Sequence, residues 1–355
     1  MSRAEVGRRR MMNSLVVVGL IAAMVVITVV AVGYGKLSIP PLTVARILWH
    51  DLMVYVGADS LAGYADWTMG ERSAVTLIRA PRAILAVLVG GALAVSGAAL
   101  QALFRNPLVS PDVIGVSSGA AFGGVLAILI GASSTVLITG SFLSGLVAAL
   151  IVMLMGRIRT SNPILTIVLG GIVVAAFFNA LVSLITYLAD TYETLPSITF
   201  WLMGSFTAAT WQKVLVALVP VVIGFGVVMA LRWRINVLAM GDEDARALGI
   251  NPGRLRVVLI TAVALLTSVT VAVAGIIGWV GLVVPHLIRL VVGPDNRVVL
   301  PASFFAGGAY VVLVDTIARS LGQAEIPVGI LTAMIGAPVF IGLLLHKARR
   351  GGSIA

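Results

Sequence analysis

The sequence has no cysteine and little charge. Without cysteine, disulfide bonds, thiolate metal sites and thiol nucleophiles are excluded. Only 11% of the 355 residues are charged, whereas a soluble globular protein carries roughly 25%. With 60% hydrophobic residues, the chain cannot cover a globular surface with polar groups. Lipid must therefore solvate much of the surface, and the composition predicts an integral membrane protein.

Lysine is also scarce, which bears on nucleotide binding. The lysines are Lys36, Lys213 and Lys347. The phosphate-binding loop of an ATPase needs a lysine in the pattern G-x-x-x-x-G-K-S/T, and none of the three stands in that setting. We therefore expect this chain not to hydrolyse ATP. We also expect it to be no enzyme and to bind no metal or cofactor of its own.

Long charge-free runs indicate membrane-spanning helices. A hydrocarbon core about 30 Å thick needs about 20 helical residues. Placing turns at the charged and Gly/Pro-rich breaks predicts an all-α polytopic membrane protein with about ten transmembrane helices, forming a single transmembrane domain over 1–355. The helices are expected near 13–34, 79–104, 113–131, 136–156, 163–189, 211–232, 256–276, 278–292, 300–320 and 328–347.

Three segments differ from plain spans. The basic stretch 1–10 before an apolar run also fits a signal peptide, but that run of about 25 residues is longer than a signal h-region, which favours a retained first helix. The segments 36–72 and 190–211 are too polar to span. We interpret both as interfacial or periplasmic elements with short helices.

The distribution of basic residues predicts the orientation. An even number of spans places both termini on one side. If that side is the cytoplasm, it holds 17 of the 24 lysines and arginines, as the positive-inside rule requires. The net charge of +10 therefore reflects membrane topology at helix ends rather than nucleic-acid binding. We expect a multi-pass inner-membrane protein with cytoplasmic termini.

The inner loop at 233–255 is more structured than a simple turn. Its acidic residues at 242–244 suit the positive N-terminal end of a helix, and Gly249 suits its end. Asn251 as N-cap and Pro252 at the first helical position open a second helix. We expect two short helices joined at a glycine, which form a cytoplasmic knob. An ordinary solvated loop and a docking element for a cytoplasmic motor are both compatible with this pattern.

Four strings then carry a resemblance to a known family. The chain resembles, over nearly its full length, the permease subunits of type II ABC importers for ferric siderophores, haem and cobalamin. The strings are "RAPRAILAVLVGGALAVSGAALQALFRNPLVSPDVIGVSSGA" (79–120), "GDEDARALGI" (241–250), "GWVGLVVPHLIRLVVGPDNRVVLP" (278–301) and "EIPVGILTAMIGAPVFIGLLL" (325–345).

The resemblance implies an assembly. The permease would form a homodimer around one central pathway, with two ATP-binding cassette subunits below it and a periplasmic substrate-binding protein above. ATP and Mg²⁺ would be bound by the partner ATPase.

The resemblance also implies roles for particular residues. Arginines in matching strings of the cobalamin permease hold glutamates of the binding protein; here they are Arg79, Arg82 and Arg319. The residues of the knob would couple to the ATPase: Gly241, Asp242, Glu243, Asp244, Ala245, Arg246, Ala247, Leu248 and Gly249. The inner gate would map onto Asn106, Pro107, Leu108, Thr160 and Ser161.

Several alternatives remain open from the sequence. A ferric siderophore is the preferred substrate, with haem, cobalamin or molybdate as alternatives. An ion-coupled secondary transporter would need intramembrane carboxylates, and its candidates are Asp112 and Asp315, both near predicted helix ends. A membrane anchor would have no use for the knob. His286, in the string "VPHLIR", is interpreted as structural rather than as a metal ligand.

Overall fold

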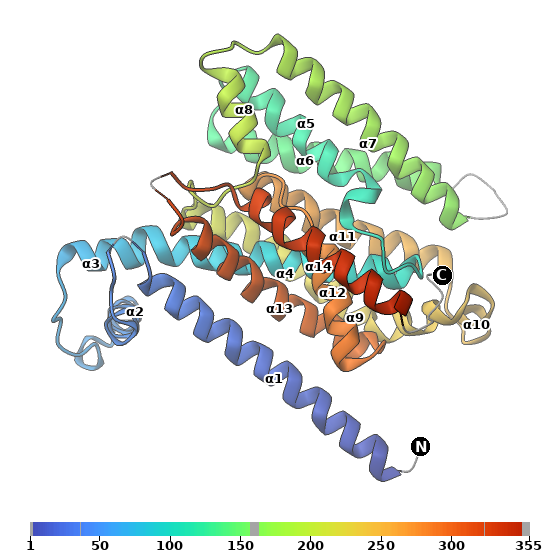
Figure 1. Cartoon of the computed structure of the whole chain (residues 1–355), viewed down its shortest axis with the longest axis horizontal. Helices are drawn as coiled ribbons and strands as arrows, with labels where there is room; N and C mark the ends of the chain where they lie inside the picture. Colours follow the sequence, from blue (N-terminus) through green and yellow to red (C-terminus); the bar gives the residue numbers. More distant parts are fainter. Residues whose placement is uncertain (1–2, 36, 157–162, 323, 350–355) are drawn as a thin grey trace.

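The computed structural model describes residues 3–35, 37–156, 163–322 and 324–349, and their regular structure is helical (Figure 1). The elements in chain order are α1 (Arg3–Gly33), α2 (Pro41–Tyr55), η1 (Asp59–Leu61), α3 (Met69–Ser73), η2 (Ala74–Arg79), α4 (Ala80–Leu103), η3 (Pro111–Ile114), α5 (Val116–Leu129), α6 (Ser134–Met155), α7 (Pro163–Leu188), α8 (Thr194–Leu202), α9 (Trp211–Met240), α10 (Asp242–Ala247), α11 (Pro252–Ala274), α12 (Val280–Val292), α13 (Asn296–Ala318) and α14 (Val328–Arg349).

The predicted fold class is confirmed. Among the described residues, seven helices are long and apolar enough to cross a membrane, and three shorter apolar helices accompany them. The shorter ones lie at Val116–Leu129, Val280–Val292 and Val328–Leu343. The chain is therefore an all-α polytopic membrane protein.

Three expected boundaries differ clearly from the structure. The first helix, expected from 13, begins at Arg3. The helix expected to end at 232 continues to Met240, because Ile235, Val237 and Leu238 bury an apolar face beyond the basic residues. The helix expected from 79 is preceded without a break by η2, a π-helical turn, and by α3. Thr68 starts α3 with a capping box, in which its side chain accepts from the backbone N–H of Glu71.

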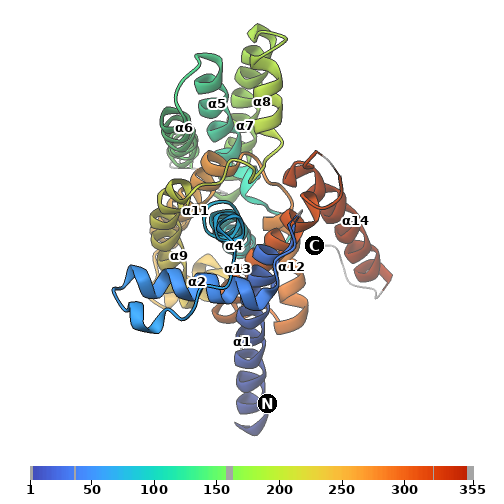
Figure 2. The same cartoon turned by 90° about the vertical axis from the view of Figure 1, so that its left-hand side faces the viewer.

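Helix α4 is the axis of the molecule. Nearly every residue from Ala80 to Leu103 is buried, because α9, α11, α12 and α13 pack around it (Figure 2). Small residues permit this close packing. A Cβ built on Gly97 would lie 1.7 Å from the carbonyl oxygen of Gly281 in α12, and one on Gly90 would lie 2.3 Å from that of Gly307 in α13.

The other helices attach to this core in two ways. Helices α5 to α8 form a second group, which contacts the core chiefly where α6 packs on α11 (Figure 1). Helix α14 lies at the periphery, against α12 and α13. Trp279, a residue with φ of 68° just before α12, packs where Gly336 of α14 has no side chain. A Cβ built on Gly336 would lie 2.7 Å from the Cβ of Trp279 and 3.0 Å from its ring.

The long axis separates two ends with different structures. Helices α2 and α3 lie at one end, and α10 lies at the other, together with the start of α1 and the end of α14 (Figure 1). We call the end with α2 and α3 the outer end and the end with α10 the inner end. The expected short helices in 36–72 and 190–211 correspond to α2 and α8.

Candidate functional site

At the outer end, Arg82 of α4 is the centre of an ion-pair cluster. Its Nε and Nη2 atoms each donate to the carboxylate of Asp315 in α13, at 2.9 Å. Its Nη1 lies 2.9 Å from Oε2 of Glu325. The side chains of Arg82 and Asp315 are only 9% and 5% exposed. A bidentate guanidinium–carboxylate pair at this depth is a strong, directional contact between two helices.

Arg79 lies about one helical turn before Arg82 and binds the end of α1. Its guanidinium donates to the carbonyl oxygens of Val32, Gly33 and Leu37 at 3.1, 3.0 and 2.7 Å. The last carbonyls of a helix have no partner within the helix. Arg79 therefore satisfies the end of α1 and fixes it against the start of α4.

Arg319 completes the cluster from the end of α13. It donates to the carbonyl oxygen of Ala31, while its Nε is buried and has no partner among the described residues. The structure thus brings Arg79, Arg82 and Arg319 together at one end, as their proposed common role requires. It also shows that their guanidinium groups already donate hydrogen bonds to carbonyl and carboxylate oxygens of the same chain.

Glu325 joins this cluster to a neighbouring loop. Its Oε2 accepts from the hydroxyl of Thr207 at 2.9 Å. Burial alone would raise the pKa of Glu325, but the hydrogen bond and charge of Arg82 outweigh it and hold that pKa below its usual range. Glu325 is about one-third exposed, so it is the part of the ion-pair cluster that solvent reaches.

The carboxylates that ion coupling would use are already engaged. Asp315 is bound by Arg82, as described above. Asp112 accepts from the hydroxyl of Ser117 at 2.7 Å, at the start of α5. The contacts of both residues are those of structural carboxylates, which weighs against the secondary transporter.

At the inner end, α10 forms the knob expected from the sequence. Asp242 holds it in place, since its Oδ1 accepts from Arg256 of α11 at 2.6 Å and from Arg105 after α4 at 3.3 Å. The backbone N–H of Ile250 returns to the carbonyl oxygen of Ala245 at 2.8 Å. The knob is thus bonded to α11 and to the segment that follows α4.

One side of the knob is packed and the other is open. Ala245 is fully buried, whereas Leu248 at the turn is 56% exposed. Glu243, Asp244 and Arg246 are also exposed. An exposed leucine among charged side chains is a surface that another protein can cover.

The knob is smaller than expected. Helix α9 takes up its first part, and the second helix is no separate short element but the beginning of the long helix α11. Asn251 caps that helix as predicted, because its side chain accepts from the backbone N–H of Arg254 at 3.1 Å. The knob therefore consists of α10 and the turn up to Asn251.

The expected gate residues fall into two groups. Asn106, Pro107 and Leu108 form a turn in which the side chain of Asn106 accepts from the backbone N–H of Leu108 at 2.9 Å. This turn directly follows Arg105 and so lies beside the knob. Thr160 and Ser161 lie outside the described residues. The gate role of both groups stays a prediction.

His286 has a packing contact. Its ring lies 6.2 Å from that of Phe340 in α14, nearly edge-on. The contact is compatible with the structural role expected for this histidine. It also adds to the seam between α12 and α14, where Trp279 packs against Phe340 in the same manner.

Sequence comparison then decides the family. The model of the FecCD transport family matches residues 20–346. The chain belongs to the FecCD transport family. It is therefore the membrane permease subunit of a type II ABC importer, and in such importers the ATPase activity belongs to a separate subunit.

Several named permeases are similar to this chain in sequence. The molybdate import permease MolB of Haemophilus influenzae is 42% identical over 334 residues, which cover 94% of this chain and 96% of MolB. The cobalamin import permease BtuC of Halobacterium salinarum is 42% identical over 280 residues, 78% of this chain and 74% of that protein. The hemin permease HmuU of Yersinia pestis is 39% identical over 306 residues, 82% and 90% of the two chains.

A solved structure agrees with the fold. A structure described as a metal-chelate type ABC transporter in an inward-facing conformation superposes with a TM-score of 0.82. The two chains are 39% identical, and the match covers 94% of this chain and 99% of the other. As a FecCD permease, the chain is a multi-pass membrane protein that works in the import of an iron chelate, haem, cobalamin or molybdate.

Proposed function

We propose that this FecCD permease forms a homodimer, binds two ATP-binding cassette subunits through its knobs, and moves its substrate inward by alternating access. The observation that carries the proposal is the knob itself. Its exposed Leu248 offers a contact for a partner, while Asp242 ties the same element to α11 and to the segment after α4. A displacement of the knob would therefore reach α11 directly and α4 through the segment that follows it.

The proposed orientation places the inner end in the cytoplasm. The start of α1, the end of α14 and α10 share that end (Figure 1), and most of the basic residues belong to it. The outer end would then face the compartment of the binding protein.

We propose a ferric siderophore as the first substrate to test and molybdate as the second. The siderophore hypothesis comes from the motif around 106–116, and iron-chelate permeases of Helicobacter pylori are 39% and 38% identical to this chain. Molybdate is favoured by the near-complete length over which the chain matches MolB. The two differ greatly in size and charge, so one assay separates them.

The assay is uptake into proteoliposomes that contain the permease, its ATPase and its binding protein. We expect ATP-dependent accumulation of a radiolabelled iron chelate, and no accumulation with the permease alone. Accumulation of labelled molybdate instead would replace the substrate and keep the mechanism. Uptake driven by an ion gradient without ATP would contradict the mechanism.

We also propose that the arginine cluster at the outer end binds carboxylates of the binding protein. Because Arg82 is already paired, such docking would exchange Glu325 for a carboxylate of the partner. Replacing Glu325 by glutamine removes this internal competitor, so we expect the binding protein to bind the Glu325→Gln permease more tightly and the difference to shrink at high salt. An unchanged affinity for the binding protein would mean that the cluster only stabilises the fold.

A further inference from the structure

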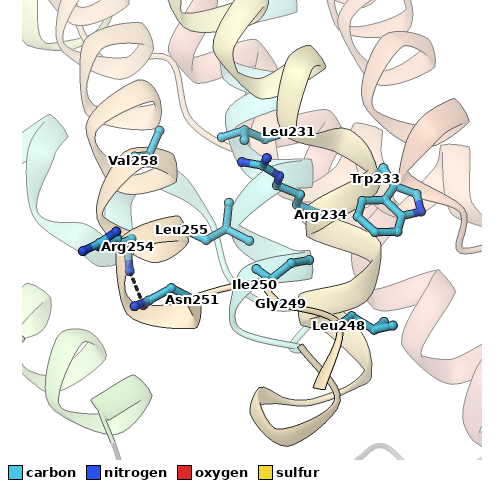
Figure 3. A pocket seen from close by; sticks show the side chains of 10 residues that line it. All are labelled: Leu231, Trp233, Arg234, Leu248, Gly249, Ile250, Asn251, Arg254, Leu255 and Val258. Carbon is cyan, nitrogen blue, oxygen red and sulfur yellow. Dashed lines mark hydrogen bonds between the residues drawn. The ribbon is translucent and has the colours of Figure 1, made fainter. Parts of the chain in front are cut away.

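A pocket lies between the inner ends of α9 and α11, beside the knob (Figure 3). Its volume is about 320 Å³. Leu231 and Val258 form the side farther from α10, and Ile250 and Asn251 form the side of the knob. Leu248 and Gly249 of the knob also line it, so the pocket adjoins the surface proposed for the ATPase. Its arginines and its apolar side have no role in that proposal.

The pocket is basic and lacks a counter-charge. Arg234 of α9 and Arg254 of α11 line it, and no aspartate or glutamate is among its lining residues. Both arginines are exposed, and neither guanidinium has a hydrogen-bond or ion-pair partner in the described part of the chain. Arg256, two residues further on, differs, because it is buried and paired with Asp242.

The arginine of α9 points away from the knob. In Figure 3 its guanidinium extends along the helix toward Leu231 and Val258, rather than toward Leu248 and the cytoplasmic turn. Arg254 lies on the far flank of α11 and marks the rim. A group that accepts hydrogen bonds from the Arg234 guanidinium would therefore approach from the membrane side of the pocket.

Exposed apolar side chains lie at the edge of the pocket and elsewhere on α9. Val258 is 45% exposed, and further along α9 the side chains of Val219, Val222 and Ile223 are all more than half exposed. Trp233, 46% exposed, lies at the same boundary, where tryptophan is typical of membrane interfaces. The pocket thus combines two arginines with apolar side chains at the expected membrane boundary.

We propose that this pocket binds the headgroup of an anionic phospholipid. The phosphate would accept hydrogen bonds from Arg234, with Arg254 adding attraction at the rim, and an acyl chain would lie over Leu231 and Val258. Basic pockets between helices at a membrane interface suit such headgroups. Because Ile250 of the knob lines the same pocket, the lipid would also support the position of the knob.

The test is native mass spectrometry of the full-length permease, titrated with phosphatidylglycerol or phosphatidylcholine. We expect preferential retention of phosphatidylglycerol, and about fivefold weaker binding in Arg234→Gln, the effect of removing one arginine near a membrane surface. Arg232→Gln is the matched control, since Arg232 is an exposed arginine of the same helix that does not line the pocket. It should bind as the parent does.

Two results would overturn the proposal. Equal losses in Arg234→Gln and Arg232→Gln, or equal retention of the two lipids, would mean that only diffuse surface charge attracts lipid. Loss of bound phosphatidylglycerol when the ATPase subunits are added would mean that the pocket belongs to the protein interface. Retention in the assembled complex would support the lipid site, and neither outcome depends on which substrate is transported.

Discussion

The arginine cluster at the outer end and the knob at the inner end hold most of their charged side chains in opposite ways. At the outer end, Arg82 is buried and bound by two carboxylates. At the inner end, Leu248 and most charged side chains of the knob are exposed to solvent. The knob is fixed to α11 by the contact of Asp242 with Arg256. A charged motif can therefore stabilise the fold or offer a surface to a partner, and burial of the side chains distinguishes the two. Removal of a residue should affect folding at the outer end and assembly at the inner end.

The largest effect is expected from Arg82→Gln. This change leaves the carboxylate of Asp315 buried without its partner, which costs about 3–5 kcal/mol of folding free energy when a buried pair is broken. The measurement is the thermal unfolding midpoint of the purified permease in detergent. Arg46→Gln is the control, because Arg46 and Asp66 are about half exposed and such a pair contributes about 0–1 kcal/mol. Equal shifts in both variants would contradict the comparison.

A smaller effect, of a different kind, is expected from Leu248→Asp. The side chain is exposed, so the unfolding midpoint should stay near that of the parent. Loss of an interface contact of about 1–2 kcal/mol should weaken association with the ATPase roughly 5–30-fold. Association is measured by titrating the ATPase onto reconstituted permease. Leu321→Asp is the matched control at the outer end, where the leucine is 61% exposed, and it should leave this association unchanged.

The smallest effect concerns pH. Because the pKa of Glu325 is lowered in the folded chain, its ionised form stabilises the fold. That contribution is fully present above the carboxyl's unfolded value of about 4.3 and is lost as the pH falls through the lower folded value. The unfolding midpoint of the parent should fall across this window, and that of Glu325→Gln should fall less steeply. Parallel curves for the two proteins would rule out this contribution.

Much of the fold follows from the sequence because the signals are local. Charge-free runs of about 20 residues indicate spans wherever they occur, and Asn251 followed by Pro252 marks the start of α11 where the structure has it. The resemblance to importer permeases rests on four such continuous strings, and it identified the family. Local patterns of this kind need no knowledge of which helices are neighbours.

The pairing of helices could not be read in the same way. Arg82 and Asp315 are 233 residues apart, and no local pattern in either segment indicates that the two side chains pair. The resemblance assigns Ala245, with the rest of the knob, to ATPase coupling. The structure shows it fully buried, so an arginine there would disturb the knob itself. Exposure depends on tertiary contacts, which hydropathy along the chain does not encode.

The distance in sequence between Arg82 and Asp315 also sets an order of events during synthesis. A ribosome adds about 5–20 residues per second, so about 10–50 s pass between the appearance of Arg82 and that of Asp315. Helix α4 enters the bilayer before the helices that later surround it exist. For that interval the guanidinium has to reach toward the lipid headgroups, and α4, which lipid scarcely touches in the finished protein, is solvated by lipid. The closing of α9, α11, α12 and α13 around α4 is therefore a late step of biogenesis, and the pairing of Arg82 with Asp315 marks its completion.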